Sequence, residues 1–111
     1  MSVTSWCHER YPVSGRALFR AESVQAVGEL VDIAMYGALI HSEAVPSPGS
    51  EVTACFVVRG YPGAFEAKGK VVSVLKNAWA IEFLREPLWL TEMLRSLDEK
   101  AKKQVPSPIG A

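Results

Sequence analysis

The sequence lacks a surplus of either charge. Twelve basic residues balance twelve acidic ones among 111 residues, so the formal net charge is zero. A protein that binds a duplex or an RNA normally carries a basic surplus that displaces counterions. A barrel that binds single strands would show a basic face with interleaved aromatic residues, whereas acidic residues are scattered among the apolar runs here. We therefore expect no DNA or RNA binding.

Long apolar runs and a secretion signal are also lacking. No apolar stretch approaches the length of about 20 residues that a membrane helix needs. Residues 1–5 have neither the basic start nor the apolar core of a signal peptide. We therefore expect a cytoplasmic protein with no membrane-inserted segment.

Cysteine is scarce. The two cysteines, Cys7 and Cys55, are consistent with a reducing compartment. Together with His8 and His41 they could be imagined as a zinc site, but the paired short spacings of structural zinc sites are missing. We expect no metal, and we interpret Cys55, which lies in an alternating run, as a small buried apolar residue.

The sequence motifs of common enzymes are absent. There is no Gly-x-Ser-x-Gly nucleophile elbow and no glycine-rich loop that would cradle a phosphate. The two histidines belong to unrelated segments and do not define a catalytic triad. We predict a protein that is not an enzyme and that has neither catalytic residues nor a cofactor.

The residues that are present indicate one small β domain. The composition is globular, with 49% hydrophobic and 22% charged residues, and the length suits a single domain. Short alternating runs separated by turn residues are typical of a small barrel. Six strands are predicted, at 16–21, 26–33, 37–42, 51–59, 65–75 and 78–84. A six-stranded antiparallel barrel would leave no sheet edge exposed.

A helix is predicted after the last strand. Behind Pro87 the apolar residues recur at helical spacing, at Leu90, Met93, Leu94, Leu97 and Ala101. We expect this stripe to pack on the barrel as structural cover. The chain then divides into an N-terminal switch-like segment (1–14), the barrel with its helix (15–103) and a flexible tail (104–111).

The stretch from Asp32 to Gly37 contains most of the candidate binding residues. Asp32 and Ala34 are two positions apart, so on a strand their side chains point to the same side. Gly37 can take the positive φ that a tight reversal needs. If Arg10, kept out of helix by Pro12, meets Asp32, the pair could grip a guanine or a phosphate. The alternative is a local structural role for each residue.

In their order and spacing, these pieces resemble the PilZ domain family. The resemblance extends from Arg10 to about Lys100 and rests on residues 10–13, 30–40, 69–72 and 80–83. It implies a mainly β fold, a six-stranded antiparallel barrel with one C-terminal helix, and a role as receptor for the bacterial second messenger cyclic di-GMP. In that family an Arg-x-x-x-Arg motif of the N-terminal segment wraps over the ligand, and an Asp/Asn-x-Ser-x-x-Gly motif lines the other side.

The resemblance assigns roles to individual residues. Arg10 corresponds to the second arginine, Asp32 to the acidic position and Gly37 to the glycine. The chain departs from the pattern twice, because Trp6 stands in the place of the first arginine and Ala34 in the place of the serine.

Two further residues could contact the ligand. Trp6 could stack on a guanine face, and His8 could donate a hydrogen bond to a phosphate. Residues Arg16 and Arg20 also have the Arg-x-x-x-Arg spacing, but they lie inside a predicted strand, where both side chains point the same way off the barrel and cannot wrap. We interpret that match as chance.

Two functional hypotheses follow. In the first, the protein is a regulatory module of cyclic di-GMP signalling. It binds the nucleotide, with an affinity that can be weak, between the Arg10 segment and the Asp32–Gly37 hairpin, and it passes the signal to a partner protein. In the second, it is a degenerate PilZ adaptor that binds no nucleotide and acts through protein–protein contacts.

Overall fold

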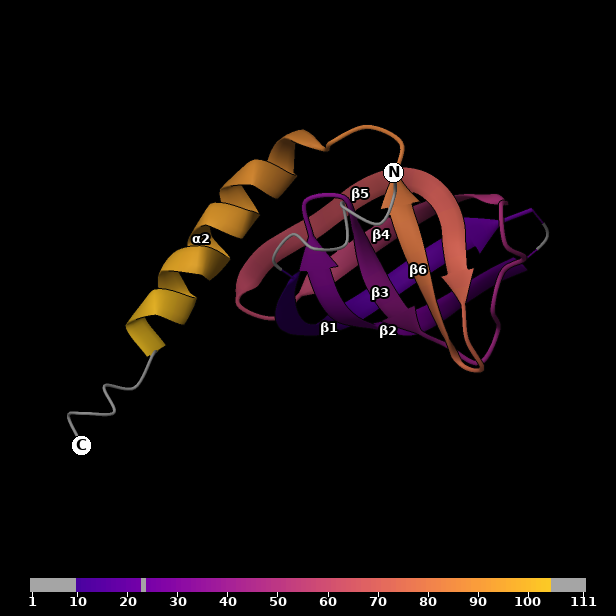
Figure 1. Cartoon of the computed structure of the whole chain (residues 1–111), viewed down its shortest axis with the longest axis horizontal. Coiled ribbons are helices and arrows are strands. Elements are labelled where there is room, and N and C mark those ends of the chain that lie inside the picture. Colours follow the sequence, from indigo (N-terminus) through magenta and orange to yellow (C-terminus); the bar gives the residue numbers. More distant parts are fainter. Residues whose placement is uncertain (1–9, 23, 105–111) are drawn as a thin grey trace.

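Six strands and one helix make up the described part of the chain. The computed structural model describes residues 10–22 and 24–104. The elements are β1 (Arg10–Ala21), β2 (Val24–Ala34), β3 (Gly37–His41), β4 (Glu51–Val58), β5 (Tyr61–Val74), β6 (Ala78–Phe83) and α2 (Leu88–Gln104). The strands pair antiparallel and close into a barrel in the order β1-β2-β3-β6-β5-β4 (Figure 1). The predicted fold class is confirmed.

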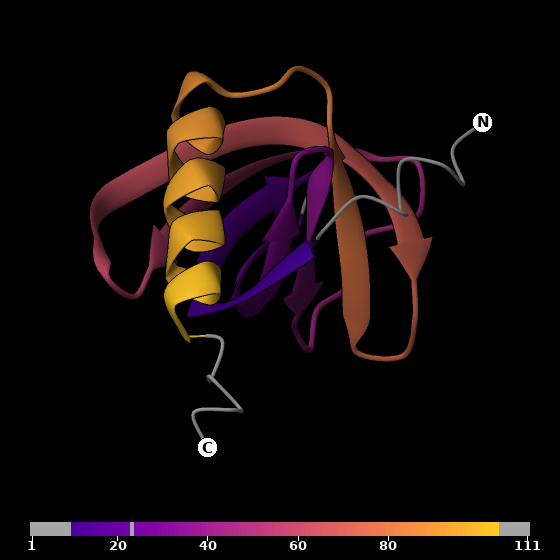
Figure 2. The same cartoon turned by 60° about the vertical axis from the view of Figure 1, so that its left-hand side comes forward.

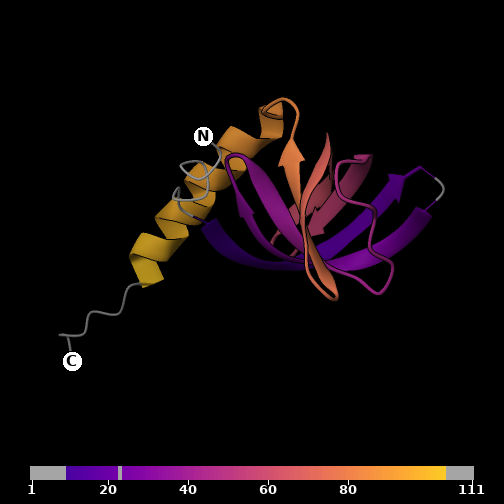
Figure 3. The ribbon, with the colours of Figure 1, turned by 45° about the vertical axis from the view of Figure 1, so that its right-hand side comes forward.

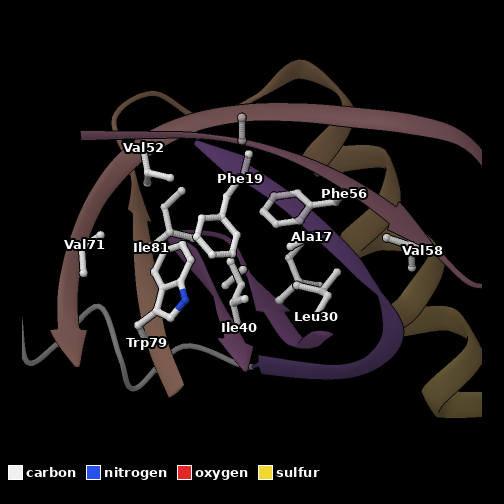
Figure 4. Close-up of a cluster of buried hydrophobic side chains, with 14 of the residues drawn as sticks. Ala17, Phe19, Leu30, Ile40, Val52, Phe56, Val58, Val71, Trp79 and Ile81 are labelled. Atoms are coloured by element: carbon white, nitrogen blue, oxygen red, sulfur yellow. The ribbon is translucent and has the colours of Figure 1, made fainter. Parts of the chain in front are cut away.

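Alternating side chains fill the inside of the barrel (Figure 4). The alternation is clearest in β4, where the buried residues are Val52, Ala54, Phe56 and Val58. The largest fully buried side chain, Trp79, packs edge to face on Phe19, with ring centroids 4.8 Å apart. Its indole Nε1 donates a hydrogen bond of 2.9 Å to the Ser42 hydroxyl, so the one polar atom of this ring has a partner inside the core.

Helix α2 covers one end of the barrel (Figures 2 and 3). Its predicted stripe is the buried side, since Leu90 and Met93 are buried and Leu94 and Leu97 pack against the core cluster. At its start, Trp89 donates an Nε1 hydrogen bond of 2.8 Å to the Glu66 carbonyl oxygen. Within residues 10–22 and 24–104, no helix combines the length and the hydropathy needed to cross a membrane.

The predicted ends of two strands are wrong. Strand β1 begins at Arg10 and not at residue 16. Residues 10–14, which we had placed in the N-terminal segment, belong to this strand, and Arg10, Tyr11 and Pro12 pair with β2. Proline is tolerated there because the β1–β2 register shifts between Pro12 and Gly15. Strand β5 likewise starts at Tyr61, directly after the turn at Gly60, whose φ is 90°. At the other end, α2 extends to Gln104, the first residue of the predicted tail, and residues 105–111 of that tail lie outside the described residues.

Gly37 is needed for a different reason from the one expected. It is not among the glycines of positive φ, which are Gly49, Gly60 and Gly63. Instead, a Cβ at position 37 would collide with the carbonyl oxygen of Ile81 on the neighbouring strand β6. The missing side chain therefore allows β3 and β6 to approach, and the prediction of a left-handed backbone is wrong.

The expectation of a buried Cys55 is also wrong. Cys55 is half-buried on β4, where its neighbours Ala54 and Phe56 face the core. Because side chains alternate along a strand, the thiol belongs to the outer face of the sheet.

Candidate functional site

The outer face at the open end of the β1–β2 ribbon, where β1 begins and β2 ends, brings the candidate residues together. In the register of the two strands, Arg10 is opposite Ala34 and Pro12 is opposite Asp32. Arg10 and Asp32 are therefore diagonal neighbours, which long side chains can bridge. Arg10 is exposed and Asp32 is half-buried. The tertiary proximity that the binding hypothesis requires exists between these two residues.

Asp32 has the electrostatic signature of a partly buried acid beside a cation. Burial raises the pKa of the Asp32 carboxyl above its usual value of 3.8, and the Arg10 guanidinium opposes that rise. The ionised carboxylate is thus held in a less solvated position than an ordinary surface aspartate. Perturbed acids of this kind are found at functional sites more often than on plain surfaces.

The β2–β3 turn closes the site on one side. Ala34 is 3% exposed, and Gly37 lies flat against the backbone of β6. Between them, Met35 and Tyr36 form the turn and are 41% and 37% exposed. The sequence analysis missed Tyr36, an aromatic residue displayed two positions from Ala34. Tyr36 could have been found from the sequence, because it occupies a variable position of the Asp-x-Ala-x-x-Gly stretch, where a hairpin turn exposes its side chains.

The remaining candidates are not all part of this cluster. Trp6 and His8 lie outside the described residues. Arg16 and Arg20, the second Arg-x-x-x-Arg match, are exposed outward residues further along β1. They share a face with Arg10, but both sit on a fully paired stretch of strand, as expected for residues that cannot wrap over a ligand.

The strand that carries Arg10 is also bonded to the helix. The side chain of Tyr11, the next residue, donates from its hydroxyl to a carboxylate oxygen of Asp98 on α2 at 3.1 Å. On β5, the Tyr61 hydroxyl donates to the Ser96 hydroxyl at 2.9 Å, and the Lys100 ammonium lies 4.5 Å from the centre of the Tyr61 ring. The start of β1 therefore has one face toward the candidate site and the other toward α2.

Replacing Asp32 by asparagine is expected to stabilise the fold at neutral pH. The pKa of Asp32 is raised in the folded state, so the folded protein prefers the protonated acid. The stability gained from this preference is fully present below the unfolded pKa of 3.8, and it is lost as the pH rises through the folded pKa. At pH 7 the ionised group therefore opposes folding, and the Asp32→Asn variant should melt a few degrees higher, on the order of 1–3 °C.

Thermal melts between pH 4 and pH 8 test this expectation. The gain should shrink toward pH 4, where wild-type Asp32 becomes protonated. Glu43→Gln, which removes one exposed negative charge elsewhere, serves as the control for net charge. A variant that melts lower than wild type at pH 7 would show that the carboxylate stabilises the fold, contrary to this account.

Comparison with known proteins agrees with the observed fold. The family model described as PilZ domain matches residues 7–96. The crystal structure of the PilZ domain of CeSA from a cellulose-synthesizing bacterium superimposes with a TM-score of 0.64 at 15% sequence identity. The match covers 84% of this chain and 98% of that domain, and at such low identity it shows a common fold. A search of curated proteins gives no match.

Proposed function

Because this chain belongs to the PilZ domain family, we propose that it is a non-enzymatic receptor module that binds cyclic di-GMP between Arg10 and the Asp32–Gly37 hairpin and passes the signal to a partner protein. The observation that carries the proposal is the diagonal placement of Arg10 and Asp32 on one outer face. A fork of donors and an acceptor carboxylate side by side match a ligand with phosphates and guanine edges.

Each residue of this face has a chemical part in the proposal. The Arg10 guanidinium donates to a phosphate or to the acceptor edge of a guanine, and its exposure leaves it accessible to solvent and ligand. The Asp32 carboxylate accepts from guanine N–H groups. Tyr36, at the turn beside them, offers an aromatic face for stacking. Trp6 and His8 of the N-terminal segment would complete the contacts above the ligand.

The expected affinity is lower than a complete pair of motifs would give. One arginine and one hydroxyl of the family pattern are replaced, by Trp6 and Ala34. A charge-assisted hydrogen bond contributes about 1.5–3 kcal/mol and a neutral one about 1 kcal/mol. Together these losses correspond to roughly a hundred- to a thousandfold in affinity, part of which stacking by Trp6 would offset.

Calorimetric titration with cyclic di-GMP, with GMP as the control nucleotide, tests the proposal. We expect saturable heat with cyclic di-GMP and a rise in melting temperature that grows with ligand concentration. The absence of both heat and a melting shift at millimolar cyclic di-GMP would remove the nucleotide-binding function.

Restoring the missing hydroxyl should strengthen binding. Ala34 stands opposite Arg10 in the β1–β2 register and is 3% exposed, so a serine there adds a hydroxyl beside Arg10 at the base of the proposed site. The Ala34→Ser variant is expected to bind cyclic di-GMP about five- to tenfold more tightly, since a neutral hydrogen bond contributes about 1 kcal/mol. Calorimetry measures the gain, and Ala64→Ser, an added hydroxyl at an exposed site on β5, is the matched control. Equal affinities of Ala34→Ser and wild type would argue against a ligand at this position.

A nucleotide-independent adaptor is the second candidate function. The substitutions Trp6 and Ala34 favour it, because both remove donors that the family pattern places at the ligand. In that case the barrel and α2 present to a protein partner a surface that does not change with nucleotide. The titration separates the two functions, because only the receptor responds to the nucleotide.

A further inference from the structure

A second set of outward residues occupies the later half of β1. Along this strand Arg16, Leu18 and Arg20 alternate with buried residues and are all exposed. Leu18, between the two arginines, is 47% exposed. Within the described residues, neither guanidinium takes part in an ion pair or a hydrogen bond. An exposed leucine between two unpaired arginines is not required by the barrel.

Apolar neighbours extend this row across three strands. Val27 on β2 and Cys55 on β4 lie directly opposite Leu18 in the two registers. Val27 is 55% exposed. With Arg20, Gln25 and Thr53 these residues line a hollow of about 350 Å³. We name the set Arg16, Leu18, Arg20, Val27 and Cys55 the β1 outer surface.

We infer that the β1 outer surface binds a partner protein through a helix that presents one apolar side chain between two carboxylates. Between Arg16 and Arg20, β1 is paired with β2 on one side and with β4 on the other, so this stretch has no free edge to which a partner could add a strand. Docking must therefore use side chains. The apolar side chain packs on Leu18 and Val27 at the edge of the hollow, and the carboxylates pair with Arg16 and Arg20.

The spacing of the arginines favours a helix as the occupant. Arg16 and Arg20 are four positions apart on the strand, a distance of about 13 Å at ~3.3 Å per residue. On a helix, two glutamates eight residues apart are separated by about 12 Å and share a face with a residue midway between them. A Glu-x-x-x-Leu-x-x-x-Glu helix thus matches the Arg16-Leu18-Arg20 row in length and in charge.

The surrounding charges argue against other occupants. Glu29 is opposite Arg16 on β2, and Glu66 is opposite Cys55 on β5. Glu22 and Glu51 lie beside Arg20. Together these carboxylates would repel the continuous phosphates of a nucleic acid or an anionic membrane at many points, whereas a helix brings only two carboxylates, each directed at a guanidinium. A second copy of this chain, docked with Leu18 on Leu18 and strands aligned, would bring arginine against arginine.

This inference deepens the proposed function, because it names the chemistry of the partner in that signalling role. The surface itself is separate from the nucleotide site. Leu18 is eight residues beyond Arg10 on the same strand, on the order of 25 Å if the strand is extended. Peptide binding at Leu18 and nucleotide binding at Arg10 can therefore be measured, and can fail, independently.

The test is a titration of the isotope-labelled full chain with a synthetic helical peptide that carries glutamate, leucine and glutamate at successive spacings of four residues. We expect amide shifts on β1, β2 and β4 around Leu18. The double variant Arg16→Ser/Arg20→Ser should weaken peptide binding at least tenfold. Leu18→Thr should weaken it as much, and threonine is a residue that favours β-strands, so this variant should keep the fold. The control Arg59→Ser/Arg95→Ser removes two exposed arginines elsewhere and should change affinity by less than twofold. Preserved spectral dispersion verifies that each variant folds.

Several outcomes would overturn the inference. These are no shifts at millimolar peptide, equal binding of a peptide with lysines in place of the glutamates, and shifts confined to other faces of the barrel. Concentration-dependent self-association that Leu18→Thr abolishes would assign the surface to a second copy. Binding to anionic lipid vesicles that Arg16→Ser/Arg20→Ser abolishes, without peptide shifts, would assign it to a membrane.

Discussion

The Arg10→Ala variant is expected to lose affinity for cyclic di-GMP by about a hundredfold or more. Arg10 is the arginine of the family pattern that this chain retains, and its guanidinium lies within electrostatic reach of Asp32. Two charge-assisted hydrogen bonds at the low end of about 1.5 kcal/mol each give roughly 3 kcal/mol, which corresponds to about two orders of magnitude in affinity. The loss also leaves Asp32 without its cation, so the carboxylate would repel the ligand phosphates.

Calorimetry of Arg10→Ala beside Arg20→Ala measures this loss. Both arginines are exposed and point outward from β1, so both variants should keep the wild-type fold. Arg10→Ala should melt slightly lower, because the half-buried Asp32 carboxylate loses its cation. Arg20→Ala should bind the nucleotide as wild type does. If Arg20→Ala were the variant that loses binding, the Arg16-x-x-x-Arg20 spacing would be the true ligand motif and the site would lie further along β1.

The Gly37→Ala variant is expected to destabilise the fold by about 2–4 kcal/mol. An added Cβ meets the carbonyl oxygen of Ile81, which is backbone and cannot turn aside as a side chain would. To make room for the Cβ, β3 and β6 must move apart, and the barrel is closed through the pairing of these two strands. For a domain of this size the melting temperature should fall by on the order of 10–20 °C, as circular dichroism can measure.

Two variants distinguish collision from backbone strain. Asparagine tolerates a left-handed backbone but carries a Cβ, so Gly37→Asn should destabilise the fold at least as much as Gly37→Ala. Gly63 has a φ of 95° and open space where a Cβ would be, so Gly63→Ala should cost only about 1–2 kcal/mol. A milder effect of Gly37→Asn than of Gly37→Ala would contradict the collision.

Two strands and the helix could be predicted closely from the sequence. In β4 the alternation of apolar residues placed the strand within one residue of its observed end, and the same holds for β6. For α2, the apolar stripe predicted both the helix and its buried side. In β4 and α2 local periodicity and burial agree, because one face packs on the core and the other faces solvent. In β6 the successive residues Trp79, Ala80 and Ile81 are all buried.

The start of β1 could not be predicted in the same way. Its first residues include Pro12 and no regular apolar pattern, so they indicated a loose segment rather than a strand. They are extended because β2 pairs with them across a register shift, a long-range contact without a local signal. The actual role of Gly37 was hidden for the same reason, since the atom that excludes a side chain belongs to Ile81, more than forty positions away.

The sequence by itself determined the kind of fold and the order of the candidate residues, because alternation, helical spacing and turn residues act between near neighbours. It could not determine that Arg10 and Asp32 share an outer face, or that the backbone of β6 lies too close to position 37 for any side chain. Nor could it show that Arg16, Leu18 and Val27 form a continuous surface. Those relations depend on strand register and on closure of the barrel, which are set by the packing of the whole core rather than by any one segment.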